Sequence, residues 1–120
     1  MKEEILIKYM KEKKFNKEKY VCWDFVRDIY KDNYKIELPE YPADEIQAEF
    51  KKYLTSNINH IKIKNNDIKE GDIIVFSLFA NQHAGVMIDN ENFIHLSEKG
   101  VQTCNIKNIR GIYVVYRIVK

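Results

Sequence analysis

Residues 83–96, HAGVMIDNENFIHL, contain two short apolar runs separated by the polar residues 89–91. Each run has the length of a β-strand, and the polar residues between them suit a tight turn. The stretch therefore predicts a β-hairpin. With the turn centred near its first polar residue, His83 and His95 are expected to lie directly opposite each other across the hairpin.

Further strand patterns lie on both sides of this hairpin, from about residue 58 onwards. The run that precedes it is rich in β-branched and aromatic residues and follows the turn sequence KEGD, residues 69–72. The predicted strands are Ile73–Phe79, Ala84–Ile88, Asn92–Leu96, Val101–Ile106 and Ile112–Val119.

The first half of the chain has helical patterns instead. Apolar side chains recur there at three- or four-residue spacing, which predicts a short helix around Ile5–Met10, a second over residues 22–32 and a third over Ala43–Leu54. Helices first and strands second, without alternation, predict an α+β fold with N-terminal helices packed on an antiparallel sheet of about five to six strands. The length of 120 residues fits one domain, 1–120.

The composition excludes several classes of function. Twenty Lys and Arg against eighteen Asp and Glu give a net charge of +2, which is too balanced to indicate a nucleic-acid partner. No segment approaches the roughly 18 apolar residues of a transmembrane helix, so no membrane span is predicted. Residues 1–14 do not resemble a signal peptide, which predicts a protein that works inside the cell or leaves it by a route other than standard secretion.

Cys22 lies at the predicted start of the second helix. Unpaired N–H groups and the helix dipole favour negative charge at this position, so we expect a lowered thiol pKa and a nucleophilic thiolate. The same N–H groups are placed to hold the oxyanion of a tetrahedral intermediate. The alternative is that Cys22 is a small apolar residue that packs the helix onto the sheet.

Two histidines of the predicted hairpin are candidates for proton transfer. If His83 and His95 face each other, one imidazole orients the other, as a general base and its orienting partner require. Gly85 has no side chain, so it is expected to let another group approach closely. The alternative is that both histidines are half-buried sheet residues with ordinary hydrogen bonds.

Together these motifs resemble the NlpC/P60 cysteine peptidases, which cut cell-wall peptides. The sequence CWDFVR, residues 22–27, is similar to the nucleophile helix of that family, and KEGDIIVF, residues 69–76, is similar to its Pro-Gly-Asp strand. The sequence HAGV, residues 83–86, matches His-x-Gly-[Val/Ile], and FIH, residues 93–95, matches the strand that ends in the third polar residue. The resemblance follows most of the chain in the right order.

This resemblance implies a papain-like fold and a Cys-His-His triad. Cys22 would be the nucleophile, His83 the general base and His95 the residue that orients the base. The implied substrate is a peptidoglycan stem peptide, cut near the D-glutamyl–diamino-acid bond, and no cofactor or metal is implied. Tyr9, Tyr20, Trp23 and Gly85 are expected at the substrate-binding site, one of the two tyrosines serving as the aromatic residue that closes it.

The sequence departs from the family pattern around the nucleophile. Val21 replaces the usual Asp, which weakens the expected helix N-cap, and Trp23-Asp24 replaces Ser-Gly. Cys-Trp is similar to members found with bacteriophage tail genes. This likeness implies phage-tail proteins as partners and delivery with the virion, so the protein is expected to be cytoplasmic or virion-delivered and to act on the cell wall.

Three alternatives stay open. A CHAP-like amidase shares the Cys-His order but has its third member further downstream, so the position of His95 argues against it. A non-catalytic tail or wall assembly protein would have a degenerate peptidase domain, with Trp23 blocking its groove. A zinc site of Cys22, His83, His95 and Cys104 is disfavoured because no paired ligand spacing supports it, and Cys104 is interpreted as a packing residue.

Overall fold

The computed structural model describes residues 1–16, 20–40, 50–78 and 81–119. These residues form three α-helices, two short 3-10 helices and six strands. In chain order they are α1 (Glu3–Glu12), α2 (Cys22–Tyr34), α3 (Phe50–Asn57), β1 (His60–Ile63), η2 (Asn65–Asp67), β2 (Ile73–Leu78), β3 (Asn81–Met87), β4 (Asn92–Ser97), β5 (Gly100–Asn105), η3 (Ile106–Asn108) and β6 (Tyr113–Ile118).

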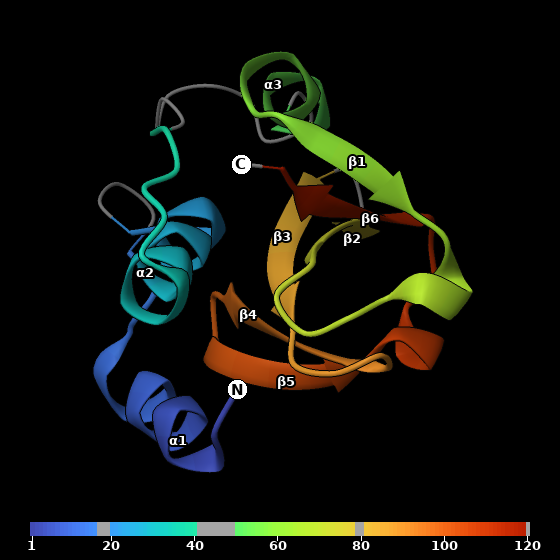
Figure 1. The fold of residues 1–120 in the computed structure, drawn as a ribbon. Helices are drawn as coiled ribbons and strands as arrows, with labels where there is room; N and C mark the ends of the chain where they lie inside the picture. The colour runs from blue at the N-terminus through green and yellow to red at the C-terminus, as the bar shows by residue number, and fades with distance from the viewer. Residues whose placement is uncertain (17–19, 41–49, 79–80, 120) are drawn as a thin grey trace.

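The six strands form one antiparallel sheet in the order β1-β6-β2-β3-β4-β5. Strands β2 to β5 follow one another as hairpins, whereas β6 returns to lie between β1 and β2. The sheet is strongly curved, and α1 and α2 lie together on one side of it (Figure 1). The predicted α+β class and antiparallel sheet are therefore confirmed.

Both faces of the sheet are buried. Along β2, Ile73 and Val75 belong to the cluster that packs against the helices, while Ile74 and Phe76 belong to a second cluster on the opposite face. Successive side chains of a strand point to opposite faces, so a strand buried on both sides needs an unbroken apolar run. This is why residues 73–76 show no polar alternation.

Helix α2 carries the apolar face that covers the sheet. Phe25, Val26 and Ile29 are fully buried, and burial of each side chain contributes roughly 1.5–3 kcal/mol. The helix continues two residues beyond its predicted end at residue 32, and Lys35 follows it in a left-handed conformation, with φ of 56°.

An ion pair joins the start of β2 to β6. The Nε and Nη2 atoms of Arg117 donate to the two carboxylate oxygens of the buried Asp72 at 2.8 and 2.9 Å. The same carboxylate accepts the backbone N–H of Lys69 at 2.9 Å, which closes the predicted turn of residues 69–72. The turn brings Gly71 to α2, where its carbonyl accepts a hydrogen bond from the Tyr30 hydroxyl.

The third helix differs from its prediction. The structure places α3 at Phe50–Asn57, so the predicted end at residue 54 is wrong, and the predicted first part, residues 43–49, lies outside the described residues. The buried Leu54 and Ile58 are four residues apart, and the Ile58 N–H donates to the Leu54 carbonyl at 3.1 Å. Because these two residues have the spacing of one helix face, the helix extends beyond its predicted end at residue 54.

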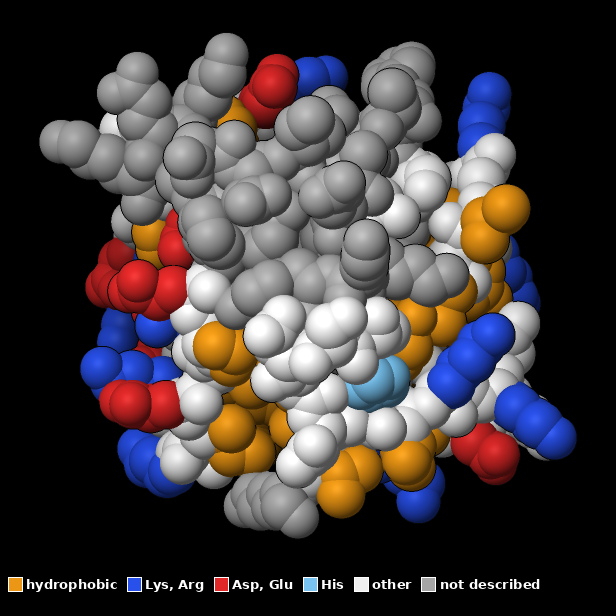
Figure 2. All heavy atoms as spheres, turned by 90° about the horizontal axis from the view of Figure 1, so that it is seen from above, with side chains coloured by type: hydrophobic (Ala, Val, Ile, Leu, Met, Phe, Trp, Pro, Cys, Tyr) orange, Lys and Arg blue, Asp and Glu red, His pale blue; other side chains and the backbone are white. Residues whose placement is uncertain are grey.

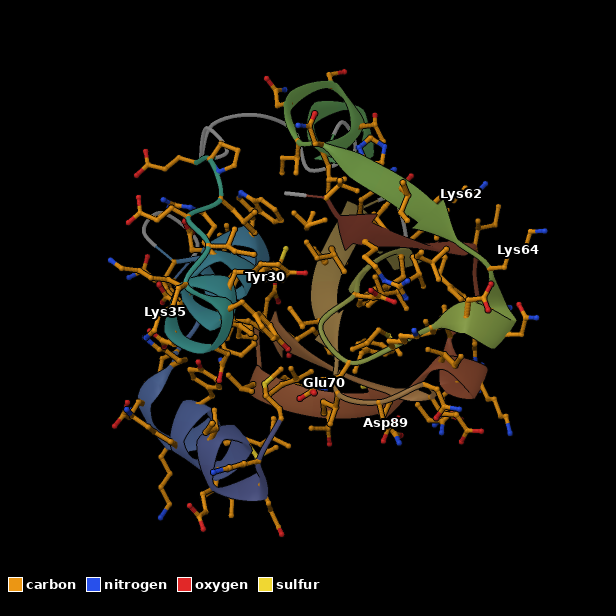
Figure 3. The ribbon with its side chains drawn as sticks, viewed as in Figure 1. Tyr30, Lys35, Lys62, Lys64, Glu70 and Asp89 are labelled. Carbon is orange, nitrogen blue, oxygen red and sulfur yellow. The ribbon has the colours of Figure 1, made fainter. Side chains whose placement is uncertain are left out.

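The surface mixes charges of both signs. Figure 2 shows acidic and basic side chains close together along one side of the face seen there, in agreement with the net charge of +2. In Figure 3, Lys62 and Lys64 point away from the body of the protein, while Tyr30 lies between α2 and the sheet. None of the described helices is both long and apolar enough to cross a membrane.

Candidate active site

Cys22 is the first residue of α2 and is buried, with 6% of its surface exposed. The backbone N–H groups of Ala84 and Trp23 act on its sulfur and lower the thiol pKa, which favours the thiolate. The N-cap residue Val21 has no capping side chain, but its N–H donates to the Asp24 carboxylate at 2.9 Å. Asp24 thus supplies part of the capping that the sequence departure at position 21 removes.

The thiol reaches β3 because the strands separate there. Strand β3 pairs with β2 over six residues but with β4 over only three, and the β3–β4 ladder ends at the Gly85–His95 pair. Residues 81–84 of β3 therefore have no partner in β4. The backbone N–H of Ala84 acts on the Cys22 sulfur at this point and lowers the thiol pKa, so the nucleophile candidate lies near the backbone of the residue next to His83.

The prediction that His83 faces His95 directly is wrong. Gly85 is the residue opposite His95, so His83 lies two positions further along β3. The turn is centred on residue 90 because the Asp89 carboxylate accepts the N–H groups of Glu91 and Asn92 at 2.8 and 2.7 Å. A shift of two residues keeps both imidazoles on the same face of the sheet, as diagonal neighbours.

Phe76 on β2 links the two histidines. Its ring stacks on the His83 imidazole, with centroids 5.6 Å apart, and meets the edge of the His95 imidazole at 5.4 Å. Phe76 is paired with His83 in the β2–β3 ladder, so both side chains stand on one face. The contact fixes the planes of both imidazoles at once.

His95 is buried, with 6% of its surface exposed, and its two ring nitrogens differ. Nε2 lies 3.5 Å from the Cys104 sulfur on β5, which corrects the interpretation of Cys104 as a packing residue only. Nδ1 is buried without a hydrogen-bond partner in the described part of the chain. A buried polar atom of this kind is uncommon and is often found at functional sites.

Burial dominates the electrostatics of the site. It raises the pKa of Cys22 to about 11, and the amides of Ala84 and Trp23 only partly offset this. The expected lowering of the thiol pKa by the helix start is therefore wrong for this state, since desolvation of the thiolate outweighs the N–H groups. Burial lowers the pKa of His83, and burial with the neighbouring charge of His83 lowers the pKa of His95 to about 4. Near neutral pH all three groups are uncharged.

Cys22 and the two histidines are not joined in a hydrogen-bonded chain. Cys22 belongs to the cluster on the helix side of the sheet, whereas both imidazoles pack against Phe76, which belongs to the cluster on the opposite side. Among the described residues, no hydrogen bond connects the Cys22 thiol to the His83 imidazole or His83 to His95. The structure places the Cys22 sulfur near the backbone of Ala84, beside His83. It packs both imidazoles against the ring of Phe76.

The tyrosines predicted for substrate binding have other partners. Tyr9 is buried, and its hydroxyl donates to Asp32, near the end of α2 that lies away from Cys22. The Tyr20 hydroxyl donates to Asp28, and the Lys13 ammonium lies 5.7 Å from the centre of the Tyr20 ring. Both contacts hold the chain before α2 against that helix.

Trp23 and Gly85 lie closer to the reactive groups. Trp23 is 1% exposed, and its indole N–H donates to the Pro39 carbonyl at 2.8 Å, so the ring is part of the core. Gly85 confirms the predicted close approach, because a Cβ atom there would lie 2.7 Å from the Ile94 carbonyl oxygen. A role of either residue in binding substrate stays a prediction.

Sequence reasoning missed Phe76 and Cys104. The signal for Phe76 was available, since antiparallel pairing of β2 with β3 places Phe76 opposite His83. Cys104 is paired with Phe93 across the β4–β5 hairpin, which brings it beside His95. In residues 1–16, 20–40, 50–78 and 81–119, no group of three or more His, Cys, Asp or Glu side chains is placed to hold a metal ion.

A family model of the NlpC/P60 family matches residues 11–120, and the chain therefore belongs to that family. Members of this family are typically cysteine peptidases or amidases, and membership suggests a cell-wall peptidase. No curated protein matches the chain.

Proposed function

We propose that the protein is a cysteine hydrolase of peptidoglycan stem peptides, with Cys22 as nucleophile, His83 as general base and His95 as the residue that orients His83. One observation carries this proposal. In this member of the NlpC/P60 family, the Cys22 sulfur at the start of α2 lies where the backbone N–H of Ala84, beside His83, acts on it and lowers its pKa. This arrangement supports the proposal that the fold is papain-like.

The charge state of the site favours a concerted mechanism. Burial disfavours both the thiolate and the imidazolium, so the resting groups are a neutral thiol and a neutral imidazole. The sulfur of Cys22 would attack the peptide carbonyl as His83 takes the thiol proton. The carbonyl oxygen then carries the negative charge, and the N–H groups at the start of α2 are placed to stabilise it.

The second half of the cycle returns the proton. His83 gives its proton to the leaving amine as the C–N bond breaks, which leaves an acyl group on the sulfur of Cys22. Water attacks this thioester while His83 takes its proton. The C–S bond then breaks, His83 returns the proton to the sulfur, and the carboxylic acid leaves the regenerated Cys22 thiol. The imidazole of His95 is proposed to hold the ring of His83 in position through both steps.

The finer assignments rest on resemblance. Cleavage near the D-glutamyl–diamino-acid bond is proposed because it is the bond for which the family is known. Phage-tail partners and delivery with a virion are proposed from the Cys22-Trp23 sequence alone.

Digestion of purified peptidoglycan tests the proposal directly. The native protein, a Cys22→Ala variant and a Cys104→Ser variant are incubated with walls of several chemotypes, and the soluble products are identified by mass spectrometry. New stem-peptide fragments from the native protein and Cys104→Ser, but not from Cys22→Ala, are expected, and their masses identify the bond. Equal fragments from Cys22→Ala would exclude Cys22 as the nucleophile.

A non-catalytic wall-binding domain is the second candidate. The buried thiol of raised pKa, with no hydrogen bond to His83 among the described residues, favours it. Such a protein would sediment with insoluble peptidoglycan and release no fragments from any chemotype. Cys22→Ala would then bind the wall as the native protein does.

A further inference from the structure

We infer that Cys104 is a positioning residue that holds His95 in the tautomer able to accept a hydrogen bond from His83. In this arrangement Nε2–H of His95 donates to the Cys104 sulfur, and the lone pair of Nδ1 is left as an acceptor. The inference rests on the proposed function, because only a general base at His83 needs such an acceptor.

The contact itself is the first support. The Cys104 sulfur lies 3.5 Å from His95 Nε2, within the range of a hydrogen bond to sulfur. A neutral thiol is both a weak donor and a weak acceptor, so either group can supply the proton. The β4–β5 ladder of six residue pairs, from Asn92–Asn105 to Ser97–Gly100, fixes the strands that carry the two side chains.

The second support is the unpartnered Nδ1 of His95. This atom is buried and has no hydrogen-bond partner in the described part of the chain. Leaving a buried polar atom unpaired is unfavourable, so its persistence indicates a partner in another state of the site. His83 is the neighbouring titratable group, and its charge acts on His95.

The chemistry of a general base selects between the two tautomers. To take the proton of Cys22, the nitrogen of His83 that faces the thiol must carry a lone pair. The other nitrogen of a neutral His83 then carries the hydrogen and needs an acceptor. If the Cys104 thiol donated to Nε2, Nδ1 of His95 would carry a hydrogen and would force the opposite tautomer on His83. Acceptance of Nε2–H by the Cys104 sulfur avoids this conflict.

Three variants of the full chain separate positioning from simple packing. Cys104→Val keeps an apolar side chain of similar size and β propensity but removes the acceptor. Cys104→Ser keeps an acceptor at the same position. Thr103→Ala, at the neighbouring exposed residue of β5, controls for any change to the strand itself. Urea unfolding establishes that each variant is folded.

The direct measurement is the tautomer of His95. Long-range proton–nitrogen correlation spectra distinguish a ring nitrogen that bears hydrogen from one that does not, and the loss of a signal in His95→Gln assigns it. We expect Nε2–H in the native protein, Cys104→Ser and Thr103→Ala, and a mixture of tautomers in Cys104→Val. Nδ1–H in the native protein, or an unchanged tautomer in Cys104→Val, would overturn the inference.

Activity gives the second readout. On a stem peptide, kcat of Cys104→Val should fall by about threefold to tenfold with KM unchanged, the effect of one ordinary hydrogen bond, and Cys104→Ser should restore it. Native kcat in Cys104→Val would contradict the inference. If the native protein cleaves no stem peptide, the proposed function fails, but the tautomer measurement still decides the role of Cys104.

Discussion

Gly85 on β3 lies directly opposite His95 on β4. A Cβ atom at position 85 would lie 2.7 Å from the carbonyl oxygen of Ile94 and 3.1 Å from the Cβ of His95. The first of these neighbours is backbone and moves only if the strand moves. The glycine therefore allows β4 to approach closely enough to hold His95 beside Phe76.

Gly85→Ala should weaken the fold and displace His95. We expect the free energy of unfolding, measured with urea, to fall by about 1–3 kcal/mol, as for other overpacked cores. Gly111→Ala is the matched control, because its Cβ would meet only the Ser77 carbonyl oxygen, at 3.2 Å. An equal loss in both variants would show that the close approach at Gly85 is not the cause.

Stability should depend on pH through His95. Burial lowers its pKa from the ordinary 6.5 to about 4, so the unfolded chain binds the proton more readily than the folded one. The contribution of neutral His95 to the free energy of unfolding is fully present above about pH 6.5. It is lost as the pH falls toward 4, to a total of about 3 kcal/mol. Urea unfolding across this range tests it, and His95→Leu should have a flatter profile. Parallel profiles for the two proteins would refute the assignment.

The loss of activity at low pH should be set by the protonation of His83. A general base must be neutral, and burial lowers the pKa of His83 below its ordinary 6.5. We therefore expect kcat/KM for a stem peptide to persist below pH 6.5 and to decline only as the pH falls through the lowered pKa. Cys104→Ser should keep the same acid limb. A decline centred at or above 6.5 would mean that His83 is not desolvated in the working enzyme.

The two cysteines should differ in their reaction with iodoacetamide. Cys22 is buried and its pKa is raised to about 11, whereas Cys104 is only partly buried. In the native protein we expect Cys104 to be alkylated first, with the sites assigned by mass spectrometry of proteolytic peptides. Faster modification of Cys22 near pH 6 would show that its thiolate is already formed, and the concerted mechanism proposed above would be wrong.

The Asp72–Arg117 pair should contribute more than any exposed pair. Arg117→Met removes the charge that compensates the buried Asp72 carboxylate and should lower the free energy of unfolding by about 3–5 kcal/mol. Glu91→Gln breaks the exposed pair with Lys107, whose ions are 3.9 Å apart, and should change it by less than about 1 kcal/mol. Similar effects in urea unfolding would mean that Asp72 is solvated.

Local patterns predicted most of the fold. The apolar run at residues 73–78 and the hairpin at 83–96 were identified because a strand leaves a period-two or continuous apolar signal. The register of that hairpin was misjudged by two residues, since it depends on how the Asp89 carboxylate binds the turn. Hydrogen bonds from a side chain to a turn are specific to the folded geometry and leave little periodic signal.

The strands and the helix that carry the candidate residues could be predicted from the sequence, but the electrostatics around these residues could not. Spacing and residue type identified Cys22, His83 and His95 as candidates, and the structure brings their strands and helix together. The burial that raises the pKa of Cys22 depends on everything packed around it, which no local pattern contains. The contact between Cys104 and His95 depends on the register of β5 and was missed for the same reason.

Because the β3–β4 ladder ends at Gly85, the backbone amide of Ala84 can serve as a spectroscopic probe of Cys22. The backbone N–H of Ala84 acts on the Cys22 sulfur, and Ala84 has no partner in β4, so its amide resonance senses the chemical state of that sulfur. Conversion of the thiol to a thioester would withdraw electron density from sulfur and alter this one amide in an otherwise unchanged sheet. The Ala84 amide resonance would thus report the fraction of acyl-enzyme during turnover, with no label attached to the Cys22 thiol.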